Sequence, residues 1–491
     1  MVETVEAPAR VGDAASGGVG LPILPGGQGE APPPARSLRF GGLWRQPDFV
    51  RLWGAETVSA FGSQVSLLAL PLIAALTLGA SELQMGLLAA AGSAPFLVVG
   101  LVAGAWVDRL PRRPILIAAD FGRAVLLLAV PIAAVADALS LGLLVAVAVA
   151  VGVLTVFYNV AYVAYLPALV RRDQLVDGNA KLQASASIAQ VAGPGLGGGL
   201  VGLVTAPLAI GLDAVSFLAS GLLLSRIRTA EPPPPPRSGQ TRIWAEIGEG
   251  WRVVVGHPLL RAMAGCSATT NFSGFLFLSV YVLYLTRDLG LGATGVGLVF
   301  AVGGVGALIG ATVAAPAARR FGTGPTMVAA QFLTGVTGLT VPLAVLFPAV
   351  ALPMVLIAEF AQWLTLLVYD VNAMSLRQAL APERLRGRVN ATARFLISGM
   401  QPIGSLAGGV LGALIGAPWT LVVGVVGMPC RSGGWCGRRC GRCGSSRRRW
   451  RTGRRAAPNP APGPRVAAGS LHRPLRREGR RRSDDGNGAR Q

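Results

Sequence analysis

Long apolar runs separated by short polar segments fill most of the chain between residues 50 and 428. About 20 apolar residues in a helix, at ~1.5 Å rise per residue, cross a ~30 Å hydrocarbon core. The pattern therefore predicts an all-α membrane protein with many spans. We expect spans at 50–78, 83–107, 114–136, 140–165, 183–204, 207–226, 263–285, 292–316, 324–347, 349–375 and 393–415, with a fragment at 417–428.

A polar, proline-rich segment divides these runs into two groups. It begins with Glu231 and five prolines at 232–236, which favour a stiff extended spacer. Residues 243–263 then show apolar positions at helical spacing, as in an amphipathic helix lying on a membrane surface or packed on protein. We expect a disordered cytoplasmic N-terminus at 1–45, a six-helix bundle at 46–228, a cytoplasmic linker at 229–262, a second bundle at 263–428 and a disordered basic tail at 429–491.

Basic residues concentrate in alternate loops between the expected spans. Because loops rich in Lys and Arg stay in the cytoplasm, this alternation predicts a multi-pass protein of the inner membrane with a cytoplasmic N-terminus. Arg287 is the exception, in a loop expected outside. The cytoplasmic set comprises Arg109, Arg112, Arg113, Arg171, Arg172, Lys181, Arg319, Arg320, Arg377, Arg384, Arg386 and Arg388.

The formal net charge of +21 comes largely from residues 429–491, which hold 18 arginines against Glu478, Asp484 and Asp485. The apolar run at 417–428 stops too early to span a bilayer. Three interpretations compete for the tail: a metal site at Cys436, Cys440 and Cys443, an arginine-rich arm for nucleic acid or anionic lipid, or a shifted reading frame. We favour the frameshift, because out-of-frame GC-rich codons produce this mixture of residues, and we expect no nucleic-acid partner.

The two groups of spans repeat each other. The loop at 173–180 resembles the loop at 383–391, and each leads into a helix with a central proline, Pro194 or Pro402. Matched positions in both groups predict two pseudo-symmetric six-helix bundles joined by a linker. This parallel repeat is typical of one large class of secondary transporters.

The loop between the second and third spans carries the most specific pattern. It contains Gly104, Asp108, Arg109, Arg112 and Arg113, in the order Gly-x-x-x-Asp-Arg-x-x-Arg-Arg. This resembles the loop signature of the major facilitator superfamily. The resemblance implies a twelve-helix fold, here with the twelfth helix truncated. It also implies that the aspartate and arginines latch the cytoplasmic face shut against the opposite half, while the alternative is a loop that only sets topology.

The fifth span contains Gly193, Pro194, Gly197 and Gly198. This run resembles the Gly-Pro-x-x-Gly-Gly signature of the exporters in that superfamily, and implies either a functional bend or close helix packing. Two departures stand out: the fourth span, 140–165, has no arginine, and the second-half copy of the loop signature has no aspartate. Further phrases resemble the bacterial branch with enterobactin and macrolide exporters: Leu52-Trp53, Gly62 to Val65, Ala69 to Leu72, Asp213 to Phe217 and Leu385 to Val389.

Few ionisable residues lie inside the spans, and each is costly in hydrocarbon, so each should face the bundle interior or water. Asp120 and Arg123 are three apart on one helix and can pair beside the signature loop. We expect this pair to support the latch. Asp213 fits a buried capping or packing acid, and Glu56 a water-facing vestibule; both are also candidates for coupling or substrate contact.

Glu359 is the acid expected nearest the membrane midplane, beside Gln362 and Trp363. We hypothesise that it carries the coupling proton or meets a cationic substrate; the alternative is an interior acid with no coupling role. Aromatic and amide groups at mid-depth suit an amphipathic substrate. Candidates for the cavity wall are Gln64, Asn159, Asn271, Tyr158, Tyr162 and Tyr281.

The sequence contains no P-loop and no Ser-His-Asp arrangement, so we expect no enzyme, cofactor or metal, and a gradient as the energy source. We therefore predict a proton-coupled exporter of small amphipathic molecules, with a small-molecule substrate, protons and the lipid bilayer as partners. An importer or facilitator of the same fold is one alternative. A non-transporting membrane protein with a basic anion-binding tail, or an inactive gene product, is another.

Overall fold

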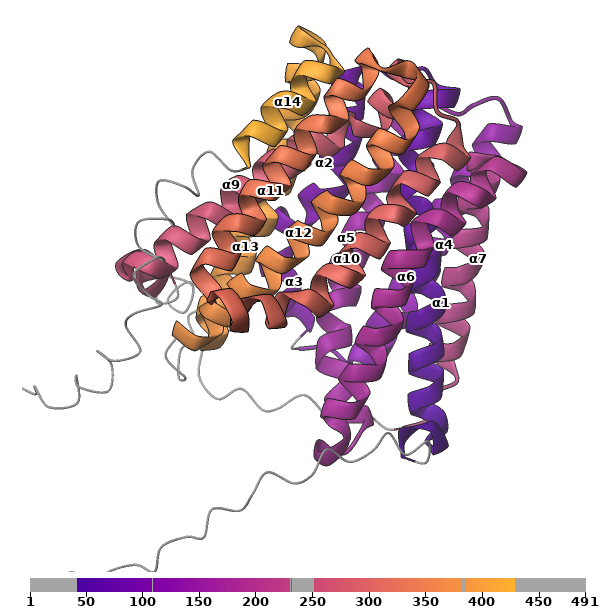
Figure 1. Ribbon diagram of the computed structural model, residues 1–491. Helices are drawn as coiled ribbons and strands as arrows, with labels where there is room; N and C mark the ends of the chain where they lie inside the picture. The colour runs from indigo at the N-terminus through magenta and orange to yellow at the C-terminus, as the bar shows by residue number, and fades with distance from the viewer. Residues whose placement is uncertain (1–41, 108, 230, 232–250, 381–385, 429–491) are drawn as a thin grey trace, which may run out of the picture.

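The computed structural model describes residues 42–107, 109–229, 231, 251–380 and 386–428 (Figure 1). These parts are built of helices, with no strand among them. Several sequence predictions lie outside the described residues and stay predictions. They concern most of the N-terminus at 1–45, Asp108, the prolines at 232–236, Arg384 in its loop, and the tail at 429–491.

The first half contains six spans, as predicted. Its second span consists of two helices, because a break falls at Val99 beside Gly100, a residue that weakens helices. The helices are α1 (Pro47–Leu72), α2 (Glu82–Val98), α3 (Gly100–Val107), α4 (Arg112–Val135), α5 (Leu141–Leu169), α6 (Leu175–Val204) and α7 (Ala206–Ser225).

The second half repeats this arrangement, with a shorter last helix. Its members are α9 (Pro258–Leu283), α10 (Ala293–Phe321), α11 (Thr323–Leu343), α12 (Ala351–Leu380), α13 (Arg386–Ile415) and α14 (Ala417–Gly427). Among the described residues, 10 helices are long and apolar enough to cross a membrane. The sequence predicts one helix at 243–263. Its described part is helical over 251–256 and then ends, and Pro258 begins the next helix, α9, because proline suits a first helical turn and not a helix interior.

Each half packs around its own helices, and the main contacts between the halves come from two helix pairs. In the first half, α1 packs on α6 and α7, and α4 on α5 and α7; in the second, α9 packs on α13 and α14, and α12 on α10 and α11. The halves meet where α2 packs on α13 and where α6 packs on α10. We call the end of the molecule with the first residues of α1, α4 and α6 the linker face, and the other end the far face. The two halves diverge toward the linker face, at the bottom of Figure 1.

The first span of each half ends in the same turn. Residues Ile73–Thr77 and Tyr284–Asp288 form π-helical ends, followed by Gly79 and Gly290 with φ of +62° and +65°. Helices α6 and α13 also end alike, at Thr205 and Gly416 with φ of 114° and 80°, and Ala-Pro follows each. These matched irregularities support the predicted repeat more specifically than the loop similarity does.

The twelfth span is truncated within the described residues. Helix α14 has 11 residues, which at ~1.5 Å each reach about half-way across a bilayer. Its apolar side packs against α9 and α11, and Leu421 and Val425 are fully buried. The short helix is therefore an integral part of the second half as far as Met428.

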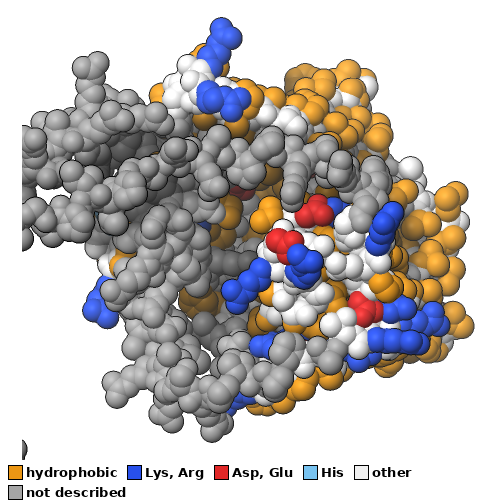
Figure 2. Space-filling view, turned by 90° about the horizontal axis from the view of Figure 1, so that it is seen from below, with side chains coloured by type: hydrophobic (Ala, Val, Ile, Leu, Met, Phe, Trp, Pro, Cys, Tyr) orange, Lys and Arg blue, Asp and Glu red, His pale blue; other side chains and the backbone are white. Residues whose placement is uncertain are grey.

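Basic side chains gather at the linker face, as Figure 2 shows from below, whereas hydrophobic side chains cover the flank of the molecule. Arg287 is the arginine described at the far face, and its guanidinium donates to the Ala80 carbonyl at 2.7 Å. This bond joins the ends of α9 and α1 across the two halves. Exposed arginines near the linker face include Arg45, Arg109, Arg171, Arg172, Arg226, Arg228, Arg252, Arg261, Arg319 and Arg320.

Candidate functional site

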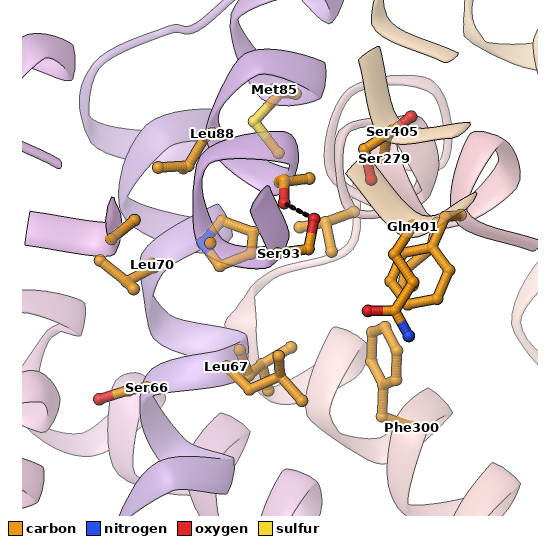
Figure 3. A pocket seen from close by; sticks show the side chains of 18 of the residues that line it. Ser66, Leu67, Leu70, Met85, Leu88, Ser93, Ser279, Phe300, Gln401 and Ser405 are labelled. Atoms are coloured by element: carbon orange, nitrogen blue, oxygen red, sulfur yellow. Dashed lines mark hydrogen bonds between the residues drawn. The ribbon is translucent and has the colours of Figure 1, made fainter. Parts of the chain in front are cut away.

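A cavity of about 400 Å³ lies between the two halves (Figure 3). Helices α1, α2, α5 and α6 line it from the first half, and α9, α10 and α13 from the second. Most of its wall is apolar. The polar residues in the wall are Gln64, Ser66, Ser93, Ser279, Gln401 and Ser405.

The glycines predicted in the fifth span, which is α6, shape the wall of this cavity and the contacts beside it. A Cβ on Gly193 would lie 2.4 Å from the Cβ of Gln64, so the glycine leaves room for the glutamine that lines the wall. Pro194 lines the cavity itself. Gly197 packs against Val65, where an added Cβ would lie 3.1 Å from the Cα atom. The run thus determines how closely α6 approaches α1.

Two pairs of glycines bring the halves into backbone contact toward the far face. In the first pair, a Cβ on Gly198 of α6 would lie 2.3 Å from the Cα of Gly297 in α10. In the second pair, a Cβ on Gly86 of α2 would lie 2.5 Å from the Cα of Gly409 in α13. All four glycines lie near the far-face ends of their helices. Both inter-half contacts therefore depend on the absence of side chains at these positions.

A buried network of polar groups occupies the first half. Arg123 forms an ion pair with Asp120, as predicted from their spacing, and both side chains are at most 5% exposed. The Ser220 hydroxyl donates to the second Asp120 oxygen at 2.6 Å. The Arg123 guanidinium carbon also lies 4.2 Å from the ring centres of Tyr158 and Phe217. Partners on three helices thus hold this arginine in place.

Tyr158 extends this network to α1. Its hydroxyl donates to the Glu56 carboxylate at 2.5 Å, while its ring lies against Arg123. The fourth span has no arginine of its own, and Arg123 of α4 supplies a cation to its surface. Glu56 is partly buried and linked through Tyr158 to the Asp120–Arg123 pair.

Asp213 lies in a second pocket of polar groups, between α7 and α1. It is 1% exposed, and its carboxylate accepts hydrogen bonds from Ser66 and, at 2.9 Å, from Ser216. Gly62 of α1 makes room for it, because an added Cβ there would lie 2.2 Å from an Asp213 oxygen. Asp213 therefore reaches the cavity wall only through Ser66, which fits the predicted packing acid.

Glu359 lies in the interior of the second half. It is 2% exposed, and it accepts hydrogen bonds from the Tyr281 hydroxyl and the Trp363 indole, each at 2.8 Å. Tyr281 packs edge-on against Phe300, with ring centres 5.8 Å apart, and Phe300 lines the cavity. The acid thus lies one layer of side chains behind the cavity wall.

Among the other predicted wall residues, Gln64 lines the cavity and the two asparagines lie elsewhere. Asn159 is exposed on α5, and the Asn271 amide donates to the Ser267 carbonyl at 3.0 Å. Neither belongs to the cavity wall as described. Gln401 of α13 does line the cavity, although the sequence pattern identified it only as part of the repeat. The signal that could have identified Gln401 was its position beside Pro402, which corresponds to Pro194 in the glycine run of the fifth span.

The signature loop is bound within its own half. The backbone N–H groups of Arg112 and Arg113 donate to the Glu231 carboxylate at 2.8 and 3.3 Å, and the Arg112 guanidinium does so at 3.1 Å. The Arg113 guanidinium donates to the Ser225 carbonyl at the end of α7, at 2.6 Å. Arg109 is exposed.

Glu231 therefore caps the N-terminus of α4, where a carboxylate is favoured by the free N–H groups and the helix dipole. The sequence pattern placed Glu231 only at the start of the linker. The available signal was a single acid before the five prolines, on a side of the protein rich in arginine. Gly104 has open space around it, since an added Cβ would meet nothing within 4 Å.

No group of three or more His, Cys, Asp or Glu side chains in the described part of the chain could hold a metal ion. The described site is thus a cavity with buried acids behind its wall, and two helical halves surround it. These features define a membrane transporter composed of two repeated bundles.

The sequence matches the family description Major Facilitator Superfamily over residues 52–282 and 263–436. The chain belongs to this superfamily. It is 29% identical over 381 residues to the multidrug efflux pump Tap of Mycolicibacterium fortuitum, with 75% of this chain and 89% of that protein covered.

Solved structures show the same fold. A mutant of the nucleoside transporter NupG gives a TM-score of 0.64 at 8% identity, covering 80% of this chain and 100% of that chain. A bacterial homologue of the iron transporter ferroportin, in an inward-facing state, gives 0.60 at 19% identity, covering 79% and 97%. The predicted fold class and family are thereby confirmed.

Proposed function

We infer that this protein is a secondary active transporter that exports small amphipathic molecules in exchange for protons by alternating access. The observation that carries this proposal is the cavity shared by both halves, with backbone contact between the halves toward the far face. Similarity to a multidrug efflux pump supports export as the direction. A cavity of this size suits a drug-sized organic molecule.

We assign the linker face to the cytoplasm. Exposed arginines gather there, whereas Arg287 is the arginine described at the far face. The glycine contacts of α2 with α13 and of α6 with α10 then close the external side. This arrangement corresponds to a conformation in which the cavity faces the cytoplasm, ready to take up a substrate from the cell interior or the inner leaflet.

We assign proton coupling to Glu359. Its two donors, Tyr281 and Trp363, are neutral, and no cation contacts it among the described residues. A carboxylate in such surroundings is costly when ionised, so it gains or loses a proton readily when access to water changes. Glu56 and Asp213 each lie in hydrogen-bonded clusters of the first half and remain secondary candidates.

We keep the predicted latch as a proposal for the opposite conformation. In the described conformation, Arg112 and Arg113 bond to Glu231 and to the end of α7, within the first half. Closing the cytoplasmic side would bring the second half toward this loop. Asp120 and Arg123 would then support the loop through α4, the helix that begins at Arg112.

Accumulation of a fluorescent lipophilic dye in cells tests the proposal. Cells that express the full chain should hold less dye than cells without it, and a proton uncoupler should abolish the difference. Higher accumulation in expressing cells would instead indicate an importer. Equal accumulation with confirmed membrane insertion would reject transport of this class of dye. Deletion of 429–491 in the same assay tests whether the tail contributes.

A further inference from the structure

We propose that the cavity selects uncharged lipophilic molecules bearing a hydrogen-bond acceptor, and that Gln401 and Gln64 bind that acceptor. The inference rests on the proposed transport function and narrows its substrate class. Similarity to an efflux pump leaves open whether the substrate is cationic, anionic or neutral. The side chains of the cavity wall decide between these classes.

No Asp, Glu, Lys or Arg occurs among the described residues of the wall. An ion that entered an apolar cavity would lose its hydration without gaining a counter-charge, at a cost of several kcal/mol. A neutral molecule bears no such cost and gains from contact with the apolar wall. Aromatic rings are available for that contact at Phe96, Phe275 and Phe300.

Two buried acids lie behind the wall and do not change this conclusion. Asp213 lies behind Ser66, whose hydroxyl it binds, and it also accepts from Ser216. Glu359 lies behind Phe300 and Tyr281, and its two oxygens accept from Tyr281 and Trp363. A cation in the cavity would therefore reach neither carboxylate directly.

The serines of the wall offer few free donors. Ser66 donates to Asp213, Ser93 to the carbonyl of Ala89 at 3.0 Å, and Ser279 to that of Leu276 at 2.9 Å. The hydroxyl hydrogens of these three serines are thus already used within the protein. Ser405 is the exception: its buried hydroxyl has no partner within the described residues, so it is a further neutral donor in the wall.

The two glutamines differ from these three serines, because neither amide has a hydrogen-bond partner within the described ranges of the chain. In Figure 3, the Gln401 amide extends into the cavity beside Phe300. Each amide presents two N–H donors and one carbonyl acceptor without charge. Gln64 comes from α1 and Gln401 from α13, so a ligand held by both contacts the two halves at once.

Three molecules of similar shape and different charge test this assignment. They are neutral triphenylphosphine oxide, cationic tetraphenylphosphonium and anionic tetraphenylborate, each measured by equilibrium dialysis with the purified full chain. We expect the oxide to bind at least tenfold more tightly than either ion. Gln401→Leu should weaken binding of the oxide by about fivefold, as expected for loss of one neutral hydrogen bond.

A negative charge placed in the cavity should change which of the three molecules binds most tightly. Gln401→Glu should tighten tetraphenylphosphonium binding at least tenfold and leave tetraphenylborate excluded. Gln378→Glu is the matched control, because Gln378 is exposed on α12 and lies outside the cavity wall. It should bind all three molecules as the unmodified protein does.

The outcomes separate this inference from the proposed function. Equal binding of oxide and phosphonium by the unmodified protein would overturn the inference, and so would binding of none of the three. Efflux of the phosphonium by the unmodified protein would also overturn it while upholding proton-driven transport. Selective binding of the oxide without gradient-driven movement would uphold the inference and reject the proposed function.

Discussion

The Tyr281 hydroxyl of α9 donates a 2.8 Å hydrogen bond to the Glu359 carboxylate of α12, in a part of the second half closed to solvent. The pair joins two helices that belong to the same bundle, and Phe300 separates it from the cavity. A proton taken up by Glu359 would therefore alter contacts directly behind the cavity wall. This relationship makes the coupling proposal testable at single residues.

Glu359→Gln should abolish proton-driven efflux, because the amide keeps the shape of the acid and cannot release a proton. Exchange of labelled for unlabelled substrate, which needs no net proton movement, should remain. Gln378→Asn is the control, because Gln378 is exposed on the same helix. Gln362 is not used for this purpose, because its side chain is buried. Unchanged uphill efflux in Glu359→Gln would remove this residue from coupling.

Gly198→Ala should strongly reduce transport, because the added methyl would lie 2.3 Å from the Gly297 Cα and prevent close approach of α6 and α10. Gly199→Ala is a control one residue away, since its methyl would meet nothing within 4 Å. Initial efflux rates at matched expression measure the difference. If both variants transported equally, the contact at Gly198 would have no part in the cycle.

Glu231→Gln should destabilise the protein by roughly 1–2 kcal/mol, because the charged cap of the α4 N-terminus becomes neutral and its ion pair with Arg112 is lost. Asp173→Asn is the matched control, as its ion pair with Arg171 is exposed and contributes little. Thermal unfolding in detergent gives the comparison. An equal, small effect of both changes would contradict the capping role.

Thr205→Gly should stabilise the protein by about 1 kcal/mol, because Thr205 adopts φ 114° and ψ 153°, a conformation that suits glycine. The pseudo-symmetric position already holds Gly416. Gly416→Ala should therefore destabilise by a similar amount. A lower melting temperature for Thr205→Gly would show that the threonine side chain makes a compensating contact.

The spans were predictable from the sequence because the length of an apolar run directly reflects bilayer thickness. The pairing of Asp120 with Arg123 was predictable because their spacing of three places them on one helix face. In contrast, the capping of α4 by Glu231 depends on the end of α7 returning to the start of α4, residues that lie 119 apart in sequence. Local patterns do not contain that proximity.

The cavity was predicted only in part, for a related reason. Gln64 was identified, whereas Gln401 was missed and Glu359 lies behind the wall. Depth in the membrane follows from position along a helix, but the direction of a side chain follows from how that helix is rotated in the bundle. The glycines at 193 and 303 leave room for Gln64 and Trp363 respectively, and these contacts join helices that are far apart in the sequence.

Transport in proteoliposomes with an imposed pH gradient tests the central claim most directly. The full chain should move triphenylphosphine oxide against its concentration gradient, in the direction opposite to proton flow, and a proton uncoupler should stop this movement. Movement in the same direction as the protons, or uphill movement that persists with the uncoupler, would contradict a proton-coupled exporter.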